Sequence, residues 1–374
     1  MSSSDSAARA WPDVLASLAA GRQLTVDQAG WAMEQVLAGA ATSAQFGAFV
    51  MGLRAKGESP SEVAALVATM LEHARLLDFG PAGAPLSLDV VGTGGDQAHT
   101  VNISTMAALV CAASGVPVVK HGNRAASSST GTADVLEELG VAIDLEPDAV
   151  VRCVQDAGIG FCFAQVHHPG LRHAGPWRRE LGIPTVFNIL GPLTNPGGAR
   201  AALIGTSNEV LAPVMADVLA ARGVRALVVR GVDGLDEVTT TGPTRVWDAT
   251  GGTVQQTQLD AADLGIPRHD PSLLRGGDRV RNAQLLMAAL GGGSPEGEDG
   301  DRIVAIRDAV AINAAAALAA FASARSADAG EDPPSGNLTE RVATHVPVAR
   351  QVLADGAAQD LLVRWAALSS GLRG

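Results

Sequence analysis

The chain has 374 residues, and its 39 acidic side chains against 27 basic ones give a formal net charge of −12. This length suffices for one large domain, or for two domains that share a cleft. Binding to DNA or RNA depends mostly on Lys and Arg that neutralise phosphates, so the net negative charge argues against a nucleic-acid partner.

The cysteines argue against a cysteine-bound metal, and the N-terminus and the apolar runs argue against a membrane protein. Cys111, Cys153 and Cys162 are odd in number and lack the spacing of metal ligands, so we expect buried, reduced thiols. The first residues contain no charged segment followed by an apolar run, and no uninterrupted apolar stretch approaches the length of a membrane span. We therefore expect a cytoplasmic protein with no membrane partner.

The first eighty or so residues favour consecutive helices. Ser59, Pro60 and Glu62 form the clearest helix start, with an N-cap, a proline at the first helical position and a capping box. Thr25 and Ser43 are predicted caps of two earlier helices. One buried stripe at helical spacing follows Glu62, consisting of Val63, Leu66, Val67, Met70 and Leu71.

A Pro/Gly-rich stretch at residues 79–85 marks a domain boundary, since continuous helix cannot cross it. Beyond it, apolar runs alternate with helical stretches. The runs are at residues 88–91, 116–119 and 226–230, and the helical stretches lie near residues 105–113 and 133–139. This alternation predicts an α/β domain with a largely parallel sheet, whose ligands bind beyond the carboxyl ends of the strands.

The first loop after a predicted strand reads GTGGD at residues 92–96, and NIST at residues 102–105 starts the next helix. Glycines let the backbone approach a phosphate, while the free N–H groups of the turn and the helix start donate to it. The Asp96 carboxylate could face a ribose hydroxyl or a metal-bound water. A purely structural tight turn is the alternative.

The second loop covers residues 120–128 and reads KHGNRAASS. Lys120 and Arg124 are cations in an acidic chain, and their neighbours are a glycine, an amide and hydroxyls. This composition suits an anionic, hydroxylated small ligand. The alternative is a solvated basic loop.

The third feature is the acidic pair Asp236 and Glu237, in a glycine-rich loop after another predicted strand. Adjacent carboxylates can hold Mg²⁺, which takes few protein oxygens and completes its shell with substrate phosphates and water. Two acids in a loop are usually only solvated. The neighbouring phosphate-type loops favour the metal, because a pyrophosphate needs one.

The fourth feature is a histidine-rich segment with His167, His168 and His173. We do not predict zinc here, because the histidines lack a supporting Cys or acidic set at suitable spacing. Arg178 follows in the same segment and could hold a carboxylate with two hydrogen bonds.

These motifs resemble those of the anthranilate phosphoribosyltransferases. The resemblance is carried by GTGGD at 92–96, NIST at 102–105, KHGNRxxSS at 120–128 followed by GTADVLEELG, and DE at 236–237. It extends from the N-terminal helices through FNILGPLTNP at 187–196 to the C-terminal helices.

The resemblance implies a nucleoside phosphorylase/phosphoribosyltransferase-like fold. It places a small all-helical domain at residues 1–85, with a returning segment at about 172–195, on a larger α/β phosphoribosyl-binding domain at residues 86–374 with a mainly parallel central sheet. It also implies an active site in the hinge region and a homodimer formed through the helical domains.

The implied reaction transfers the phosphoribosyl group of 5-phosphoribosyl 1-pyrophosphate (PRPP) to the amine of anthranilate, giving N-(5-phosphoribosyl)anthranilate and pyrophosphate. This is the second step of tryptophan biosynthesis from chorismate. Pyrophosphate would leave through an oxocarbenium-like transition state, and Lys120 would neutralise its charge. An arylamine attacks without prior deprotonation, so no general acid or base is assigned.

The resemblance also implies the site residues. Mg²⁺, as two ions, would be held by Ser104, Asp236 and Glu237. Anthranilate would contact Gly92, Asn123 and Arg178. PRPP would contact the two loops and the helix starts beside them, at Gly92, Gly95, Asp96, Thr100, Asn102, Ile103, Ser104, Thr105, Lys120, His121, Gly122, Asn123, Arg124, Ala125, Ala126, Ser127, Ser128 and Thr132.

Two alternatives stay open at this point. A pyrimidine nucleoside phosphorylase would share the architecture, but it expects a lysine-histidine-serine run in place of residues 91–96. A nucleic-acid-binding relative would need a basic face. Departures from the family pattern are few: His99 and Trp177 affect only local loop shape, and residues 291–301 and 330–337 are predicted surface insertions.

Overall fold

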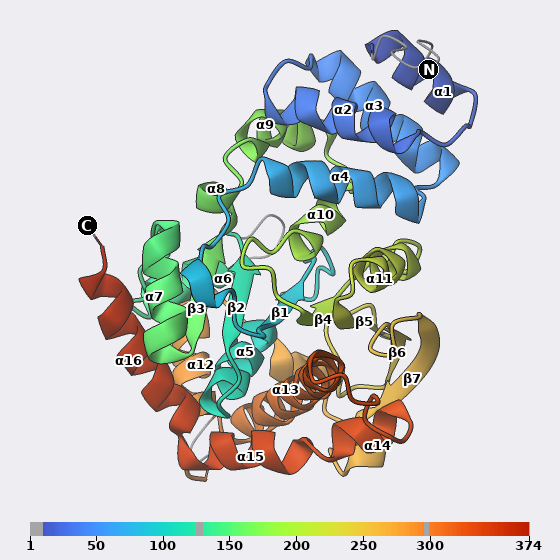
Figure 1. Cartoon of the computed structure of the whole chain (residues 1–374). Coiled ribbons are helices and arrows are strands. Elements are labelled where there is room, and N and C mark those ends of the chain that lie inside the picture. Colours follow the sequence, from blue (N-terminus) through green and yellow to red (C-terminus); the bar gives the residue numbers. More distant parts are fainter. Residues whose placement is uncertain (1–9, 125–129, 295–298, 374) are drawn as a thin grey trace.

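The computed structural model describes residues 10–124, 130–294 and 299–373. A helical domain lies at one end of a larger body built on one sheet, with the C-terminal helices on the opposite side of that sheet (Figure 1). The helical domain contains α1 (Trp11–Ala19), α2 (Val26–Leu37), α3 (Ser43–Lys56) and α4 (Pro60–Glu72). A later segment, α9 (Leu171–Leu181), packs on α2 and α3.

Side-chain caps begin three of these helices. Thr25 and Ser59 are N-caps as predicted; the box at Ser59 was predicted too, and Thr25 also forms one, with Gln28. The prediction that Ser43 caps α3 is wrong: Thr42 is the cap, and its Oγ1 accepts from the Gln45 N–H at 3.2 Å. Gln45 stands three residues after Thr42, where its side chain can return to the Thr42 N–H and complete the box. The predicted stripe after Glu62 is buried except for Leu71, which is half-buried.

The larger domain has one seven-stranded sheet in the order β3-β2-β1-β4-β5-β6-β7. The first five strands in that order are parallel and the last two pair antiparallel. The mainly parallel sheet of the predicted fold class is therefore confirmed. The strands are β1 (Leu88–Gly92), β2 (Val118–Gly122), β3 (Ile159–Phe163), β4 (Ala201–Gly205), β5 (Arg225–Gly231), β6 (Pro243–Asp248) and β7 (Gln255–Asp260).

Helices cover both faces of the sheet. Alternate residues of β1, β4 and β5 point to opposite sides, so each face has its own apolar core. One core includes α5 (Ile103–Ala113), α6 (Thr132–Glu138), α7 (Pro147–Ala157), α12 (Arg279–Leu290), α13 (Gly300–Asp328), α14 (Leu338–Ala343), α15 (Val346–Asp355) and α16 (Ala357–Gly371). The other is continuous with the helical domain through α10 (Phe187–Leu193) and α11 (Ala212–Ala221). Short elements complete the chain: η1 (Gly80–Ala82), α8 (Ala164–His167), η2 (Ala261–Leu264) and η3 (Pro271–Leu274).

The helix α13 runs through the middle of the larger domain and contacts β1, β4 and β5. By length and composition this helix could cross a membrane, although no such stretch was predicted from the sequence. However, 83% of its most apolar segment is buried inside the fold, as in the core helix of a soluble protein. The three cysteines are free and buried, as predicted. The predicted surface segment 330–337 is largely exposed, and of 291–301 the residues 295–298 lie outside the described parts.

Candidate active site

The loop after β1 lies against the loop that carries the acidic pair. Gly92 pairs with Gly205 at the ends of the neighbouring strands β1 and β4. A side chain on either glycine would collide with Asp236. A Cβ on Gly92 would meet the Asp236 carboxylate, and a Cβ on Gly205 would meet the Asp236 backbone carbonyl. The Gly94 N–H donates to Asp236 Oδ2 at 2.6 Å. Glycine at these positions therefore lets the acidic loop lie directly against the ends of β1 and β4. Gly205 was not predicted from the sequence, because a glycine at a strand end has no distinctive local pattern.

The second acid of the pair contacts the start of α5. Glu237 Oε1 accepts from the Ser104 N–H at 3.1 Å, so the helix N-terminus faces a carboxylate. The structure thus brings Ser104, Asp236 and Glu237, the three predicted metal ligands, to one place at the carboxyl ends of the strands. In the described part of the chain, no three His, Cys, Asp or Glu side chains are grouped closely enough to hold a metal by themselves.

The negative charge that Asp236 and Glu237 would carry when ionised is only partly compensated by nearby positive charge. Burial, together with the carboxylates of Asp96 and Glu237, raises the pKa of Asp236 well above its ordinary value. Burial raises the pKa of Glu237 to about 8, although Lys120 opposes this shift. Two buried carboxylates facing a third are stabilised when a cation joins them. Their oxygens are hard donors, so the residues fit Mg²⁺ completed by phosphate oxygens.

Lys120 lies at the centre of this arrangement, buried in β2. Its Nζ donates to the Val90 carbonyl and to Ser104 Oγ, the latter at 3.3 Å. Burial lowers the pKa of Lys120, while the carboxylates of Asp89 and Glu237 raise it. The ammonium is therefore held beside the acid pair and the start of α5, where an anionic group would be neutralised.

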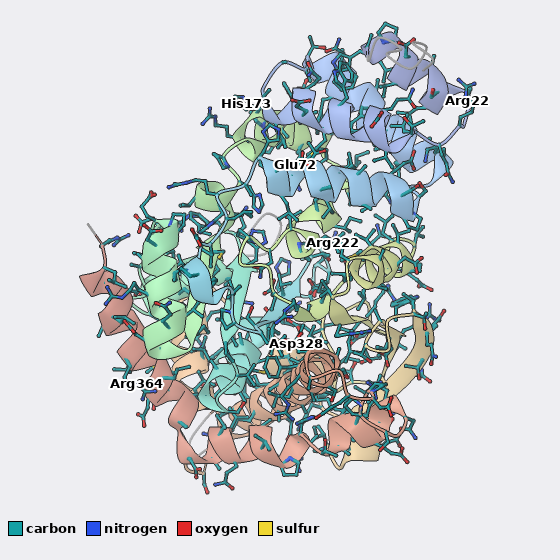
Figure 2. All side chains as sticks on the ribbon, viewed as in Figure 1. Arg22, Glu72, His173, Arg222, Asp328 and Arg364 are labelled. Carbon is teal, nitrogen blue, oxygen red and sulfur yellow. The ribbon has the colours of Figure 1, made fainter. Side chains whose placement is uncertain are left out.

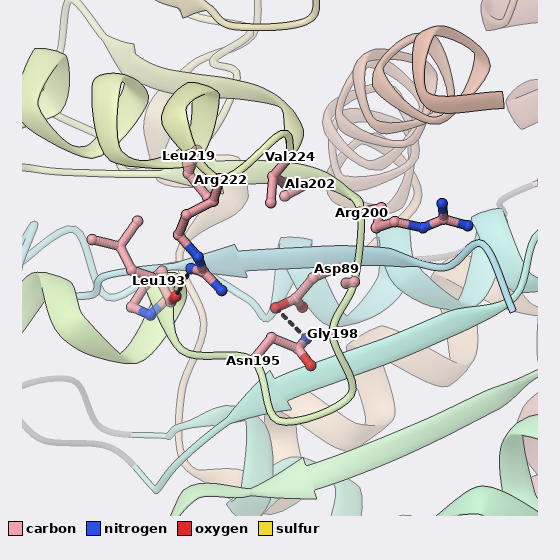
Figure 3. Close-up of a pocket in the computed structure, with 11 residues that line it drawn as sticks. Asp89, Leu193, Asn195, Gly198, Arg200, Ala202, Leu219, Arg222 and Val224 are labelled. Carbon is pink, nitrogen blue, oxygen red and sulfur yellow. Dashed lines mark hydrogen bonds between the residues drawn. The ribbon is translucent and has the colours of Figure 1, made fainter. Parts of the chain in front are cut away.

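Asp89 was not predicted from the sequence. Its carboxylate holds the backbone of β2 next to Lys120. Its carboxylate accepts from the His121 N–H at 3.2 Å and from Asn195 Nδ2 at 2.7 Å, the contact drawn in Figure 3. Burial raises its pKa to about 6. Asp89 and Asn195 line a cavity of about 130 Å³ together with Arg222. None of the predicted substrate residues lines that cavity. We therefore assign Asp89 the structural role of holding β2 in place.

The rest of the second loop is only partly described. His121 Nδ1 is 2.8 Å from the Gly191 carbonyl, and burial and the nearby His168 lower the pKa of His121 to about 3. Asn123 is exposed, and its Oδ1 accepts from the Arg124 N–H at 2.8 Å. Arg124 pairs with two acids of α6, Asp134 and Glu137. Four predicted PRPP contacts lie outside the described residues: Ala125, Ala126, Ser127 and Ser128.

The remaining predicted donor-side residues lie around the starts of α5 and α6. Asn102 Nδ2 donates to the Thr130 carbonyl at 3.4 Å, and its Oδ1 accepts from Asn282. Thr105 and Thr132 join the two helix starts through their hydroxyls, 3.4 Å apart. Thr100 forms an isolated bridge with Arg275, Gly122 ends β2 and Ile103 begins α5. Gly95 has a φ of 84°, and His99 takes the left-handed conformation rare for a non-glycine residue.

Arg178 comes from α9, on the helical domain. Its guanidinium lies over the Phe187 ring at 6.0 Å, and burial lowers its pKa. Among the described residues, the Arg178 guanidinium has no hydrogen bond or ion pair, whereas the backbone carbonyl of Arg178 accepts from the Gly182 N–H. A partly buried guanidinium without a counter-ion is suited to a ligand carboxylate.

In the described residues, His167, His168 and His173 are not part of any group of three or more His, Cys, Asp or Glu side chains that could hold a metal. His167 Nδ1 is 2.6 Å from the Arg75 carbonyl and His168 Nε2 is 2.9 Å from the Thr194 carbonyl. His173 lies on the helical domain, away from the sheet (Figure 2). The first two histidines therefore join chain segments to one another.

Comparisons with known proteins decide the family. Residues 84–359 match the glycosyl transferase family, a/b domain, and residues 12–74 match the glycosyl transferase family, helical bundle domain. The anthranilate phosphoribosyltransferase of Salinispora arenicola (strain CNS-205) is 53% identical over 365 residues, covering 98% of each chain. The chain belongs to the anthranilate phosphoribosyltransferase family.

Solved structures agree with this assignment. Anthranilate phosphoribosyltransferase from Thermus thermophilus is 38% identical, with a TM-score of 0.81 over 97% of this chain and all of its own. The enzyme from Saccharomyces cerevisiae, solved in complex with PRPP and Mg, is 26% identical, with a TM-score of 0.81 over 96% of this chain and 98% of its own. Another structure of the yeast enzyme is a complex with 4-fluoroanthranilate.

As an anthranilate phosphoribosyltransferase, the chain is a pentosyltransferase of the tryptophan pathway, and the family expected from the sequence is confirmed. The predicted fold class is confirmed as well, with an N-terminal helical domain and a larger α/β domain. The comparisons do not favour a nucleoside phosphorylase or a nucleic-acid-binding relative.

Proposed function

We propose that the chain transfers the phosphoribosyl group of PRPP to anthranilate at the edge of the sheet where the loops after β1, β2 and β5 meet. One observation carries the proposal: the acid pair at 236–237, the glycine loop and the start of α5 are joined there by direct hydrogen bonds. Lys120 adds a buried cation to the same place. Relatives with this fold are solved with PRPP and Mg, and with an anthranilate analogue.

Asp236, Glu237 and Ser104 would hold Mg²⁺, as two ions. When bound, the metal would neutralise charge on the pyrophosphate as it leaves. The support for this assignment is that both carboxylates are buried and crowded, so a cation relieves their repulsion.

The donor would be held by N–H groups of the glycine loop, by the hydroxyls at the helix starts and by the 120–128 loop. Lys120 would stabilise the leaving group electrostatically, since its ammonium is fixed by the Val90 carbonyl and by Ser104. Charge stabilisation and positioning of the two substrates would account for the rate enhancement, and no side chain is needed as a general acid or base.

Anthranilate would bind between the domains. Arg178 would hold its carboxylate, because this guanidinium is partly buried and has no counter-ion among the described residues. Asn123, in the second loop, and Gly92 would lie beside the amine. The acceptor would then be presented by the helical domain to the donor on the sheet.

We also propose that the enzyme is a cytoplasmic homodimer joined through its helical domains. Val26 and Met51 expose apolar surface on that domain, which suits a partner contact. Light scattering coupled to size exclusion would test the dimer, and a monomer at micromolar concentration would contradict it.

Activity is tested by mixing the protein with anthranilate, PRPP and Mg²⁺ and following the loss of anthranilate fluorescence. We expect loss of fluorescence and release of pyrophosphate in equal amounts, both dependent on Mg²⁺. Thymidine and inorganic phosphate in the same assay test for phosphorolysis. Release of thymine without consumption of anthranilate would overturn the proposal.

A further inference from the structure

The core helix α13 carries one polar side chain inside a long apolar stretch. Between Asp308 and Ser323 the sequence reads AVAINAAAALAAFA, in which only Asn313 has a polar side chain. Asn313 is fully buried. A buried amide is destabilising unless its hydrogen-bonding groups are paired, so its partners explain why this position is polar.

The partners of Asn313 are the two backbone groups of Val238, the residue directly after Glu237. Asn313 Oδ1 accepts from the Val238 N–H at 2.9 Å, and its Nδ2 donates to the Val238 carbonyl at 2.9 Å. Nδ2 also donates to the Ala309 carbonyl within α13, at 2.8 Å. Bonding both groups of one residue fixes the position and the orientation of that part of the backbone.

The hydrogen bonds between Asn313 and Val238 connect the acidic loop to the core helix α13. The helix α13 packs on β1, β4 and β5, so Val238 is fixed relative to the strands whose ends bear Gly92 and Gly205. The two hydrogen bonds to Val238 hold the backbone one residue away from Glu237 and two residues away from Asp236.

We propose that Asn313 is a positioning residue for the metal loop: it holds Asp236 and Glu237 in place for Mg²⁺ without touching metal or substrate. The inference rests on the proposed assignment of these two acids to the metal. Substituting residues that orient metal ligands typically weakens metal binding about 10- to 100-fold. Asn313→Ala should therefore weaken binding of PRPP with Mg²⁺ by about tenfold or more.

The experiment is a calorimetric titration of PRPP in the presence of Mg²⁺, with the melting temperature of the metal-free protein measured beside it. Ser323→Ala is the matched control, since Ser323 is buried on the same helix and, among the residues that the structure describes, its Oγ bonds only within α13, to the Ala319 carbonyl at 3.1 Å. We expect weaker binding and a higher Mg²⁺ requirement for Asn313→Ala, an unchanged KM for anthranilate, and parent-like binding for Ser323→Ala.

Unchanged PRPP binding in Asn313→Ala would overturn the positioning role. So would an equal rise in the anthranilate KM, which would indicate a general loosening of the fold. If Asn313→Ala does not fold, Asn313→Ser, which replaces the amide with a hydroxyl, is measured in the same way.

A parallel double variant, Asp236→Asn with Glu237→Gln, separates this inference from the proposed function. If the double variant keeps Mg²⁺-dependent turnover, the metal assignment fails and the role of Asn313 fails with it. If the double variant loses turnover while both Asn313 variants bind PRPP normally, only the role of Asn313 is wrong.

Discussion

Gly205 lies against the backbone of Asp236 so closely that a Cβ atom on Gly205 would overlap the Asp236 carbonyl oxygen. Gly205→Ala should therefore push the acidic loop off the end of β4. A displacement of about 1 Å at a catalytic group can cost about 100-fold in rate, so we expect kcat/KM to fall by at least about that factor. Steady-state kinetics with circular dichroism would measure both activity and folding.

Gly251→Ala is the control for that substitution. A Cβ at Gly251 would meet no atom within 4 Å in the described parts of the chain beyond its two neighbours in sequence, and this residue lies in the turn between β6 and β7, away from the proposed site. It should keep parent-like kinetics. A folded Gly205→Ala variant with normal kcat/KM would show that the position of Asp236 does not matter to turnover.

The acid pair is predicted to be essential for turnover but not for folding. Burial disfavours the ionised form of both acids, and Asp236→Asn with Glu237→Gln removes that cost, so the metal-free melting temperature should stay the same or rise. Turnover should fall about 100-fold or more, because the charge that holds Mg²⁺ is lost. Near-parental activity in excess Mg²⁺ would contradict the metal assignment.

Much of the site could be predicted because its signals are local in the sequence. Glycines beside hydroxyls after a strand, and the adjacent acids at 236–237, indicate anion and metal chemistry wherever they occur. Gly205, Asn313 and Asp89 could not be assigned this way, because each acts on a loop or strand far away in the chain. The parallel sheet followed from alternating patterns, whereas the cap of α3 did not, since Thr42 and Ser43 are both good cap residues.

The stability of the metal-free protein should fall as the pH rises. Glu237 has a pKa of about 8 in the folded protein against an ordinary 4.5, so the folded state keeps a proton that the unfolded chain has already lost. The stabilising contribution is therefore complete below about pH 4.5 and is lost as the pH rises through about 8. Melting curves without metal should show this decline in the parent.

Glu237→Gln tests the cause, because glutamine has no proton to lose. Its melting temperature should vary less over the same pH range than that of the parent. Mg²⁺ with PRPP should also reduce the decline in the parent, since a bound cation favours the ionised acid. Parallel curves for the parent and Glu237→Gln would assign the pH dependence to other groups.

Arg178 is predicted to act on anthranilate and not on the phosphoribosyl donor. A hydrogen-bonded charge pair contributes about 1.5–3 kcal/mol, so Arg178→Ala should raise the KM for anthranilate about 10- to 100-fold. The KM for PRPP should change little, because Arg178 comes from α9 on the helical domain and the donor loops follow the strands.

Two further variants test the assignment of Arg178. Arg178→Lys keeps the charge but loses the planar pair of donors, so it should restore only part of the anthranilate affinity. Arg179→Ala removes the next arginine of the same helix, which is exposed, and should leave both KM values unchanged. Equal increases in both KM values for Arg178→Ala would mean that the helical domain, rather than one guanidinium, had been disturbed.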